Sequence, residues 1–526
     1  MKIGKLTLKN FKFFYGEETL DFEGKNVLLY GENGSGKSSI YAALYTLLNN
    51  AKSPNIKIQN YFNHREKNRL LNRYIEAVDT GRISITLVDG EEYAISNDNV
   101  DIIQYKRGTT IKEASIASDF INYKLLAKLY DFKHSQTIDL FELFESDIFS
   151  YLTYDTHRNY DNVWDGFLKK EKTAPRKWSN EYMTFIRNID SFNTKLNTFL
   201  DSIIESTNTI LQEHFYSNLK ISFTYRPLEY DSNHDIPRYR DLINPKINIT
   251  ISLLNDNIPI DANRKIEQPH TFLNEAKLTA IALSIRLAIL RTRISADVLK
   301  ILVLDDLLIS LDMSNREIVA NMLIEDDFLK DYQIIMLTHD RAFFEMAKQK
   351  FDSVPEYPWN FFEMYINDEG DFEKPYLQKS LNYFEKAEKY FREYDYSACA
   401  NYLRKEVERI KKLKAIEESV GVPVDRSMRI IKSLISSDDF TNFSRPATTN
   451  DTCIGRVRGK LIGIKHNLDQ AREPTVEIDL KDIASILQRI LHPQSHDDTS
   501  RPLYKKELEE AIEIIQGIRD TIPTEG

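Results

Sequence analysis

The sequence predicts an α/β protein in which a mixed sheet with flanking helices is followed by an all-helical region. Three observations lead to this prediction. A short apolar stretch at 26–30 runs into a glycine-rich turn and then a helical pattern. Strand and helix patterns alternate between 300 and 366, which is typical of parallel βαβ units. After about residue 376 apolar residues recur only at helical spacing, so we expect at least two domains in the 526 residues.

The first segment, residues 1–126, is predicted to hold strands around one helix. Alternating apolar and polar residues indicate half-buried strands, and a continuous apolar run indicates a fully buried one. Asp89-Gly90-Glu91 joins two alternating stretches and predicts a hairpin. The expected elements are strands at 2–8, 18–22 and 26–30, a helix at 38–48, and a hairpin of 82–88 with 92–95.

Residues 127–216 turn helical and rich in aromatic residues, with the longest predicted helix at 182–215. A clean heptad pattern is not sustained over three or four repeats. We therefore expect a compact inserted helical lobe and not a long coiled-coil arm. One stripe of the long helix is apolar and is expected to face the core; it consists of Phe185, Ile186, Ile189, Phe192, Leu196 and Leu200.

Residues 217–375 return to a mixed pattern, and residues 376–526 are predicted to form an all-α domain that serves partner binding or oligomerisation. In the mixed segment we expect strands at 219–225, 247–253, 300–304, 333–337 and 361–366, with helices at 272–290 and from about 314. In the C-terminal domain we expect amphipathic helices at 376–412, 426–435, 454–468, 480–491 and 504–519.

Composition describes an ordinary globular protein, with 42% hydrophobic and 29% charged residues. The net charge of −10 gives no basic footprint for nucleic acid. No apolar run is long enough for a membrane span, and the start lacks the apolar core of a signal peptide. The two cysteines, Cys399 and Cys453, suit buried thiols in a reducing compartment. We therefore expect a cytoplasmic protein without membrane contact.

The strongest motif is Gly31-Glu32-Asn33-Gly34-Ser35-Gly36-Lys37-Ser38, which fits the phosphate-loop pattern G-x-x-x-x-G-K-[ST] in full. Bare main-chain N–H groups of such a loop converge on phosphate oxygens, and the following helix adds the positive end of its dipole. An accidental glycine-rich turn is disfavoured because a buried strand precedes the motif and a helix follows it. Lys37 is expected to bridge two phosphates, and Ser38 to bind Mg²⁺. The expected nucleotide contacts are Gly31, Asn33, Gly34, Ser35, Gly36, Lys37, Ser38 and Ser39.

A second motif, Ile301-Leu302-Val303-Leu304-Asp305-Asp306, places two carboxylates at the end of a buried strand. Ligands of open α/β sheets bind at this end of the strands. Asp305 is predicted to hold Mg²⁺, directly or through water. Asp306 is predicted to orient or deprotonate an attacking water. Taken alone the pair could also cap a helix, but the phosphate loop favours the catalytic interpretation.

The third motif, Leu337-Thr338-His339-Asp340, ends another apolar strand. A histidine there can hydrogen-bond a terminal phosphate oxygen, whereas by itself it would suit an ordinary solvated loop. The order of the three motifs along the chain favours a catalytic role for His339, beside Lys37 and Asp306.

Together with Leu8-Lys9-Asn10-Phe11-Lys12, these motifs resemble the RecF, RecN and SMC type of ABC ATPases. Asp306-Leu307-Leu308-Ile309-Ser310-Leu311-Asp312 resembles their D-loop, and Leu273-Asn274-Glu275-Ala276-Lys277 takes the place of their signature. The resemblance implies one ATPase head built from 1–126 and 217–375, interrupted by the lobe. It also implies ATP and Mg²⁺ as ligands, hydrolysis of ATP to ADP and phosphate, and ATP held between the phosphate loop of one copy and the signature of another.

The chain departs from the family pattern at three places. Asn274 stands where the signature has serine, and we expect it and Glu275 to contact the nucleotide. Asp306 stands where glutamate is usual, so slow hydrolysis is expected. For the metal-contacting glutamine the candidate is Gln104, with Gln136 as a rival.

The wording around the phosphate loop and the signature resembles a narrower group, the anti-phage defence ATPases that include the AriA subunit of PARIS and the PtuA subunit of Septu. That resemblance implies a homo-oligomer that holds or controls a separate nuclease effector.

The helical C-terminus contains Arg489 and His496 in the spacing R-x₆-H, a loose form of the HEPN RNase motif. A helix end broken by Pro493 explains the same residues more simply. Two other interpretations of the chain therefore remain open: a DNA-repair clamp of the RecF or SMC kind, and an ATPase-gated RNase.

Overall fold

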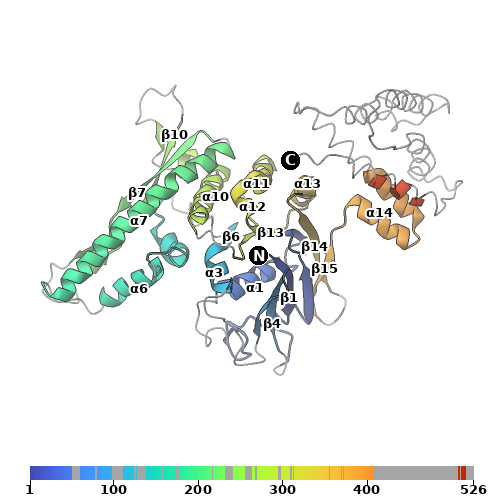
Figure 1. Ribbon diagram of the computed structural model, residues 1–526, viewed down its shortest axis with the longest axis horizontal. Helices are drawn as coiled ribbons and strands as arrows, with labels where there is room; N and C mark the ends of the chain where they lie inside the picture. The colour runs from blue at the N-terminus through green and yellow to red at the C-terminus, as the bar shows by residue number, and fades with distance from the viewer. Residues whose placement is uncertain are drawn as a thin grey trace. The chain divides into compact units, whose positions relative to one another are not determined.

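The computed structural model describes most of residues 1–406 and part of 508–516 (Figure 1). It divides into two compact units, Met1–Lys379 and Ser380–Gly526. The segments outside the described residues are 50–59, 77–79, 97–109, 124–125, 127–137, 156–157, 172–177, 232–240, 255–263, 267–268, 294–297, 308–310 and 407–507, the single residues 216, 312, 353, 355, 369, 371, 510 and 514, and 517–526.

A six-stranded sheet forms the centre of the first unit, in the order β15-β14-β3-β13-β12-β6. All neighbouring strands are parallel except β15, which is antiparallel to β14. Every residue of β3 and β13 is buried, as their continuous apolar sequences predict. The strands are β3 (Asn26–Gly31), β6 (Asp119–Asn122), β12 (Ile301–Asp305), β13 (Gln333–Thr338), β14 (Trp359–Asn367) and β15 (Lys374–Lys379).

The parallel pairing brings together the ends of three strands that are distant in sequence. Thr338 at the end of β13 is paired with Tyr30 in β3, and Leu337 is paired with Asp305 at the end of β12. The carboxyl ends of β3, β13 and β12 therefore lie side by side at one edge of the sheet. This confirms the predicted βαβ arrangement.

A second sheet is antiparallel and has the order β2-β1-β4-β5. It confirms the strands predicted at 2–8 and 18–22 and the predicted hairpin. The strands are β1 (Ile3–Lys9), β2 (Glu17–Asp21), β4 (Arg82–Leu87) and β5 (Glu92–Ser96). Helix α1 (Lys37–Asn49) packs between this sheet and one face of the central sheet, where Ile40 and Leu44 share a core with Leu6 and Val303.

The two sheets are joined by a buried amide side chain. Gln333, at the start of β13, accepts a hydrogen bond from the N–H of Ile3 at 2.6 Å through Oε1. Its Nε2 donates to the carbonyl oxygens of Ile3 at 2.9 Å and Lys25 at 2.8 Å. One buried side chain thus meets three main-chain groups close to the junction of the sheets.

Helices cover the opposite face of the central sheet. The core on this face contains Leu302, Leu304 and Met336, which alternate with the residues that face α1. The covering helices are α10 (Glu275–Arg291), α11 (Met313–Glu325) and α13 (Arg341–Asp352). Shorter helices of the unit are α3 (Thr110–Ala117), α5 (Phe141–Leu143), η2 (Phe144–Ile148), α9 (Pro269–Phe272) and α12 (Asp327–Lys330).

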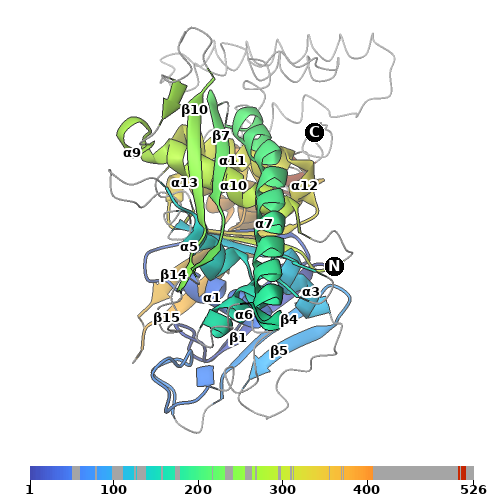
Figure 2. The same ribbon diagram turned by 90° about the vertical axis from the view of Figure 1, so that its left-hand side faces the viewer.

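The lobe is dominated by α7 (Asn180–Glu213), which confirms the long predicted helix (Figure 2). The Ser179 hydroxyl caps it by accepting from the N–H of Tyr182 at 3.1 Å. The predicted stripe is buried except for Ile186, which is partly buried. Helix α6 (Tyr160–Glu171) packs beside it through aromatic contacts such as Trp164 with Phe192, at 5.9 Å between ring centroids.

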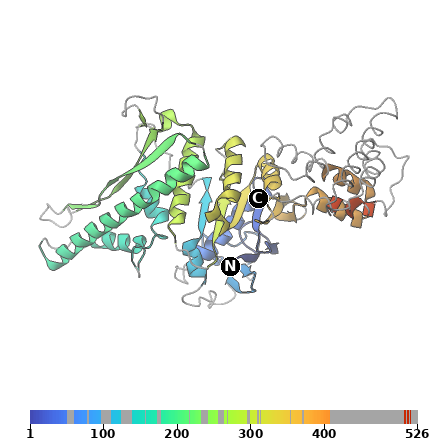
Figure 3. The same ribbon diagram turned by 45° about the horizontal axis from the view of Figure 1, so that its top comes forward.

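Strands of the third segment pair among themselves and lie against the long helix. β7 (Leu219–Arg226) and β10 (Lys246–Leu253) form an antiparallel sheet with β11 (Lys265–Ile266), separate from the central sheet. β7 packs on α7, and α7 packs on α10. Together α7, β7 and β10 project away from the central sheet (Figure 3). A further two-stranded sheet consists of β8 (Glu229–Asp231) and β9 (Asp241–Ile243).

In the second unit α14 (Tyr383–Arg392) begins with a capping box formed by Asn382 and Glu385. It packs with helical residues 396–406 and parts of 508–516, and its core includes the buried Cys399. The sequence predicted one helix over 376–412. The prediction is wrong for 376–379, which belong to β15, because these residues find main-chain partners in β14. It is also wrong that the helix is continuous, because α14 ends at Arg392 and a turn, in which Tyr394 has a φ of 63°, precedes the helical residues 396–406. The predicted helices at 426–435, 454–468 and 480–491, and Cys453, lie outside the described residues.

The described helices include none whose length and apolarity would suit a membrane crossing. Even α7, the longest, carries polar residues on most of its surface and buries only one stripe.

A buried ionic network ties α10 to the edge of the central sheet. Arg286 donates to both carboxylate oxygens of Asp119 in β6, at 2.7 and 2.6 Å, and also to Asp147 in η2. Arg293 donates to Asp119 as well, at 3.3 Å. Burial alone would raise the pKa of the Asp119 carboxyl, but the two guanidinium groups outweigh it and lower that pKa. The network therefore fixes α10, the lobe and the sheet edge relative to one another.

We expect Arg286→Lys to destabilise the protein by about 2 kcal/mol, because a lysine keeps the charge but loses the two-pronged contact with Asp119. Thermal unfolding monitored by circular dichroism should show the midpoint lowered by several degrees. Arg158→Lys is the matched control, since Arg158 makes a similar contact with Asp155 but is exposed, and it should change the midpoint little. Equal midpoints for the two variants would contradict the structural role of the network.

Candidate nucleotide-binding site

The phosphate-loop motif connects β3 to α1 as the sequence predicted. The strand ends at Gly31 and the helix begins at Lys37. Gly34 and Gly36 have φ angles of 87° and 108°, in the region that favours glycine. A side chain at Gly36 would also come within 2.9 Å of the Phe13 ring. The glycines are thus required by the path of the main chain around this turn.

The loop is open on its outer side. Glu32, Asn33 and Gly34 are exposed, as is Ser38 in the first turn of α1, whereas Ser35 is buried. The first N–H groups of an α-helix have no partner within the helix. Together with the positive end of the helix dipole, they favour the binding of an anion at the helix start. The arrangement of exposed loop and helix start is that of a phosphate-binding turn.

Lys37 is buried, and its ammonium group is held at the mouth of the loop. Nζ donates to the carbonyl oxygens of Gly31 at 2.7 Å and Glu32 at 3.0 Å. Burial lowers the pKa of this ammonium group, and the negative charges of Asp306 and Asp305 partly oppose the shift. Lys37 therefore lies within electrostatic reach of both carboxylates, which come from a part of the chain about 270 residues away.

Asp305 ends β12 and is the carboxylate best suited to a metal ion. Burial, followed by the charge of Asp306, raises its pKa to about 6, although Lys37 and the Ser38 hydroxyl oppose the shift. Its Oδ1 is buried and has no hydrogen-bond partner among the described residues. A buried carboxylate oxygen without a partner is costly unless a cation or donor meets it. Asp305 and Ser38 together fit Mg²⁺, which binds few protein oxygens and completes its shell with phosphate and water.

Asp306 adopts a φ angle of 48°, uncommon for a residue with a side chain. Its N–H donates to the carbonyl oxygen of Leu337 at 3.0 Å. Its Oδ1 accepts from the main-chain N–H of His339 at 3.0 Å and lies 2.8 Å from Nδ1 of the His339 ring. One carboxylate thus joins the ends of β12 and β13 and contacts both the main chain and the ring of His339.

The signature segment opens α10. Asn274 is exposed, and its Oδ1 caps the helix by accepting from the N–H of Lys277 at 3.0 Å. Glu275 accepts a hydrogen bond from the Tyr123 hydroxyl at 3.1 Å. These two residues belong to a separate helix start from the phosphate loop.

Other predicted residues lie outside the described part of the chain. They are Gln104 and its rival Gln136, Leu308 to Ser310 and Asp312 of the D-loop, and the C-terminal pair Arg489 and His496.

Two arginines beside the site escaped the sequence analysis. Arg341 stacks over the ring of Tyr30, which precedes Gly31, and donates to Glu363 at 2.9 Å. Arg316 contacts both the D-loop and Asp340. Arg341 directly follows the motif that ends at Asp340, and Arg316 lies four residues after the D-loop. This closeness in sequence could have identified both arginines as candidates.

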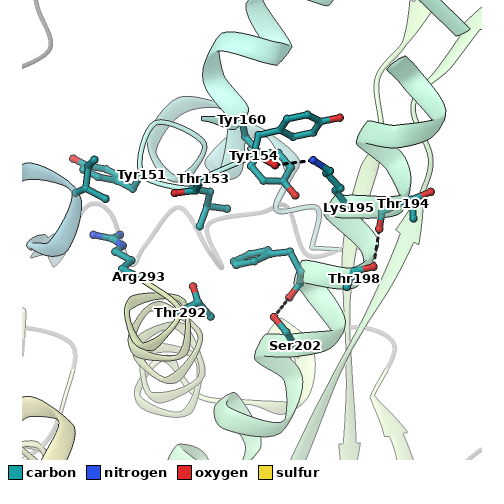
Figure 4. Close-up of a pocket in the computed structure, with 13 residues that line it drawn as sticks. Tyr151, Thr153, Tyr154, Tyr160, Thr194, Lys195, Thr198, Ser202, Thr292 and Arg293 are labelled. Atoms are coloured by element: carbon teal, nitrogen blue, oxygen red, sulfur yellow. Dashed lines mark hydrogen bonds between the residues drawn. The ribbon is translucent and has the colours of Figure 1, made fainter. Parts of the chain in front are cut away.

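A cavity of about 380 Å³ lies elsewhere, between the lobe and the C-terminal end of α10 (Figure 4). No residue of the phosphate loop lines it. Lys195 donates to the carbonyl oxygen of Tyr154 at 2.8 Å, and the hydroxyl groups of Thr198, Ser202 and Thr292 donate to carbonyls of their own helices. These four polar groups of the cavity are therefore satisfied within the protein.

Comparison with known families gives one match that covers most of the chain. The sequence model of the family RecF/RecN/SMC N terminal domain matches residues 2–356. No curated protein sequence matches the chain.

Several solved structures resemble the chain at low identity. One is an Smc head bound to the C-terminal winged-helix domain of ScpA, with 14% identity, a TM-score of 0.37, and coverage of 72% of this chain and 98% of that chain. A second is an Smc head with an extended coiled coil bound to the C-terminal domain of ScpA from Pyrococcus furiosus, with 16% identity, a TM-score of 0.38, and coverage of 75% and 99%. A third is the SMC head of Thermotoga maritima, with 14% identity, a TM-score of 0.31, and coverage of 72% and 100%.

Proposed function

The chain belongs to the RecF/RecN/SMC N-terminal domain family, an ABC-type ATPase fold, and from this premise we propose that it binds ATP with Mg²⁺ and hydrolyses it slowly between two copies of itself. The observation that carries the proposal is the meeting of three strand ends. The phosphate loop after β3, Asp305 and Asp306 after β12, and His339 after β13 come together at one edge of the central sheet.

Each residue has a chemical task in this proposal. Lys37 exchanges its two loop carbonyls for phosphate oxygens, whose negative charge also opposes the cost of burying its ammonium group. Ser38 and Asp305 would hold Mg²⁺, which supplies charge neutralisation at the phosphates when it is bound. Asp306 would orient or deprotonate the attacking water, and His339 would keep that carboxylate in place and hydrogen-bond the terminal phosphate.

A second copy is part of the proposal because the start of the signature helix α10 is separate from the phosphate loop of the same chain. Asn274 is exposed and holds the first turn of α10 in order. The free N–H groups of this turn suit a phosphate supplied from outside the helix. We therefore propose that the signature of one copy completes the site of another, which makes the active form a homo-oligomer of at least two heads.

Mass photometry of the purified full-length chain, with and without ATP and Mg²⁺, tests this proposal. We expect ATP to shift the population from monomers to dimers or higher assemblies, and ADP to shift it less. A parallel assay of phosphate release should show hydrolysis that requires Mg²⁺ and rises with protein concentration more steeply than linearly. A chain that releases no phosphate and does not bind ATP would overturn the assignment.

At a finer level we propose that the ATPase is the regulatory subunit of an anti-phage defence system and controls a separate nuclease. The motif wording around Gly31 and Asn274 supports this. Co-expression with the proteins encoded by the neighbouring genes, followed by gel filtration, should give one complex that contains a nuclease whose activity depends on ATP. The family membership also supports a RecF- or SMC-like DNA clamp, which predicts ATP hydrolysis stimulated severalfold by duplex DNA. A nuclease that elutes separately, together with DNA-stimulated hydrolysis, would favour the clamp.

An ATPase-gated RNase remains the third candidate. It predicts cleavage of total RNA by the wild-type chain and loss of that cleavage on His496→Ala. Retention of the cleavage in this variant would exclude the histidine from the reaction.

A further inference from the structure

We propose that Arg316 is a positioning residue that couples the D-loop to the histidine beside the terminal phosphate. The inference rests on the proposed ATPase function and deepens it. Arg316 lies in the first turns of α11, directly after the D-loop, and its side chain is largely buried, with 15% exposed. It touches neither the phosphate loop nor the two carboxylates after β12, so any effect on hydrolysis must pass through other residues.

The guanidinium group of Arg316 makes two different contacts. Its Nε donates to the carbonyl oxygen of Leu311, near the end of the D-loop, at 2.7 Å. Its Nη1 donates to Oδ2 of Asp340, the residue after His339. A planar guanidinium presents its N–H groups in a fixed fork, so the position of one acceptor constrains the other.

Asp340 passes this constraint on to its neighbour His339 and to the start of α13. Its Oδ1 accepts from the N–H of Phe343 at 2.9 Å and so caps α13. Burial opposes ionisation, but the Phe343 N–H and Arg316 lower the pKa of the Asp340 carboxyl. Asp340 is therefore held as an anion between α11 and α13.

The contacts attach Asp306 and Leu311, at the two ends of the D-loop, to the same short segment. The loop starts at Asp306, which holds His339 through Oδ1, and it returns through Leu311 to Arg316 and Asp340, the neighbour of His339. Both ends of the loop are thus attached to residues 339–340. In the proposed assembly a second copy presses on the D-loop, and a displacement of Leu311 would shift Asp340 and with it His339. Arg316 is the side chain that makes this link.

A second ion pair between α11 and α13 provides a control that distinguishes the proposed role of Arg316 from helix packing. Glu317, next to Arg316, forms an ion pair with Lys350 of α13 at 2.8 Å. This pair also joins α11 to α13, but its contacts among the described residues include neither Leu311 nor Asp340. Glu317→Gln is therefore the control for loss of an inter-helix ion pair.

The test is steady-state ATP hydrolysis by the full-length chain, together with binding of a fluorescent ATP analogue and mass photometry. Arg316→Ala should lower kcat by about 10- to 100-fold while KM, analogue binding and ATP-dependent assembly change about twofold or less, because a misplaced group slows the reaction without weakening the nucleotide contacts. Arg316→Lys, which can contact Asp340 but loses the fork, should lie between alanine and the wild type. Asp340→Asn keeps the helix cap and should resemble Arg316→Ala, and the double variant should be no slower than either single one.

Glu317→Gln should hydrolyse ATP at the wild-type rate. A wild-type kcat for Arg316→Ala, or an equal loss of kcat for Glu317→Gln, would overturn the coupling role while leaving the ATPase assignment intact. A wild-type chain that neither binds nor hydrolyses ATP would instead overturn the proposed function and the inference with it. If Arg316→Ala fails to fold, as judged by its thermal midpoint, the lysine variant and Asp340→Asn still decide between these outcomes.

Discussion

Replacing Lys37 by alanine is expected to abolish ATP binding at concentrations that saturate the wild type. The ammonium group is the one positive charge that the phosphate loop itself carries, and it is already buried at the loop mouth. A charge-assisted hydrogen bond to phosphate contributes about 1.5–3 kcal/mol, and Lys37 would make two. We therefore expect the dissociation constant to rise by at least about 100-fold, measured with the fluorescent ATP analogue.

The control for this change is Lys330→Ala. Lys330 is exposed in α12, which precedes the start of β13, the opposite end of that strand from His339. It should bind the analogue like the wild type. Because the alanine at 37 also leaves the carbonyls of Gly31 and Glu32 without this donor, the thermal midpoint of the variant must be compared with that of the wild type. A stable Lys37→Ala variant that binds ATP normally would contradict the phosphate-loop assignment.

Replacing Asp306 by asparagine is expected to uncouple ATP binding from hydrolysis. Asparagine keeps an oxygen in the position that accepts from the N–H of His339, so the local geometry should survive. It cannot accept a proton from water, and general base catalysis typically contributes 10²- to 10⁴-fold. We expect kcat to fall by about 100-fold or more and the ATP-bound assembly to persist in mass photometry, since its nucleotide is no longer consumed.

Asp306→Ala helps to separate the two roles of this carboxylate. It removes both the base and the partner of the His339 ring, so it should be at least as slow as the asparagine variant. Asp331→Asn, at an exposed position, serves as the control for the loss of one negative charge and should leave kcat unchanged. Hydrolysis by Asp306→Asn at the wild-type rate would show that the base is another group.

The parts of the site that follow strand ends were predictable from the sequence. A buried parallel strand needs a continuous apolar run, which is visible in the sequence. Ligands bind at the carboxyl ends of such strands, so the polar residues directly after β3, β12 and β13 could be identified as candidates for the site. The stripe of α7 was equally visible, because helical spacing directly encodes which face is buried.

The parts that depend on which strand pairs with which were not predictable. Residues 374–379 carry Lys and Gln among Tyr and Leu and suit a helix as well as an edge strand; only pairing with β14 decides the matter. The alternating patterns of β7 and β10 indicated strands but could not show that they form their own sheet against α7. Arg316 escaped notice for the same reason, since its two acceptors, Leu311 and Asp340, come together only in the fold.

The amide of Gln333 has a mechanical consequence. Gln333 fastens the N-terminal strand to the start of β13, so the two sheets that enclose α1 cannot slide past each other without breaking the two buried hydrogen bonds between Gln333 and Ile3. A third bond, to Lys25, holds the start of β3. The amino-terminal ends of β1, β3 and β13 should therefore behave as one stiff block. We expect motion that accompanies ATP turnover at the carboxyl ends of the strands, where loops connect the parts of the site. Hydrogen exchange should therefore show slow amides at Ile3 and faster ones around residue 311.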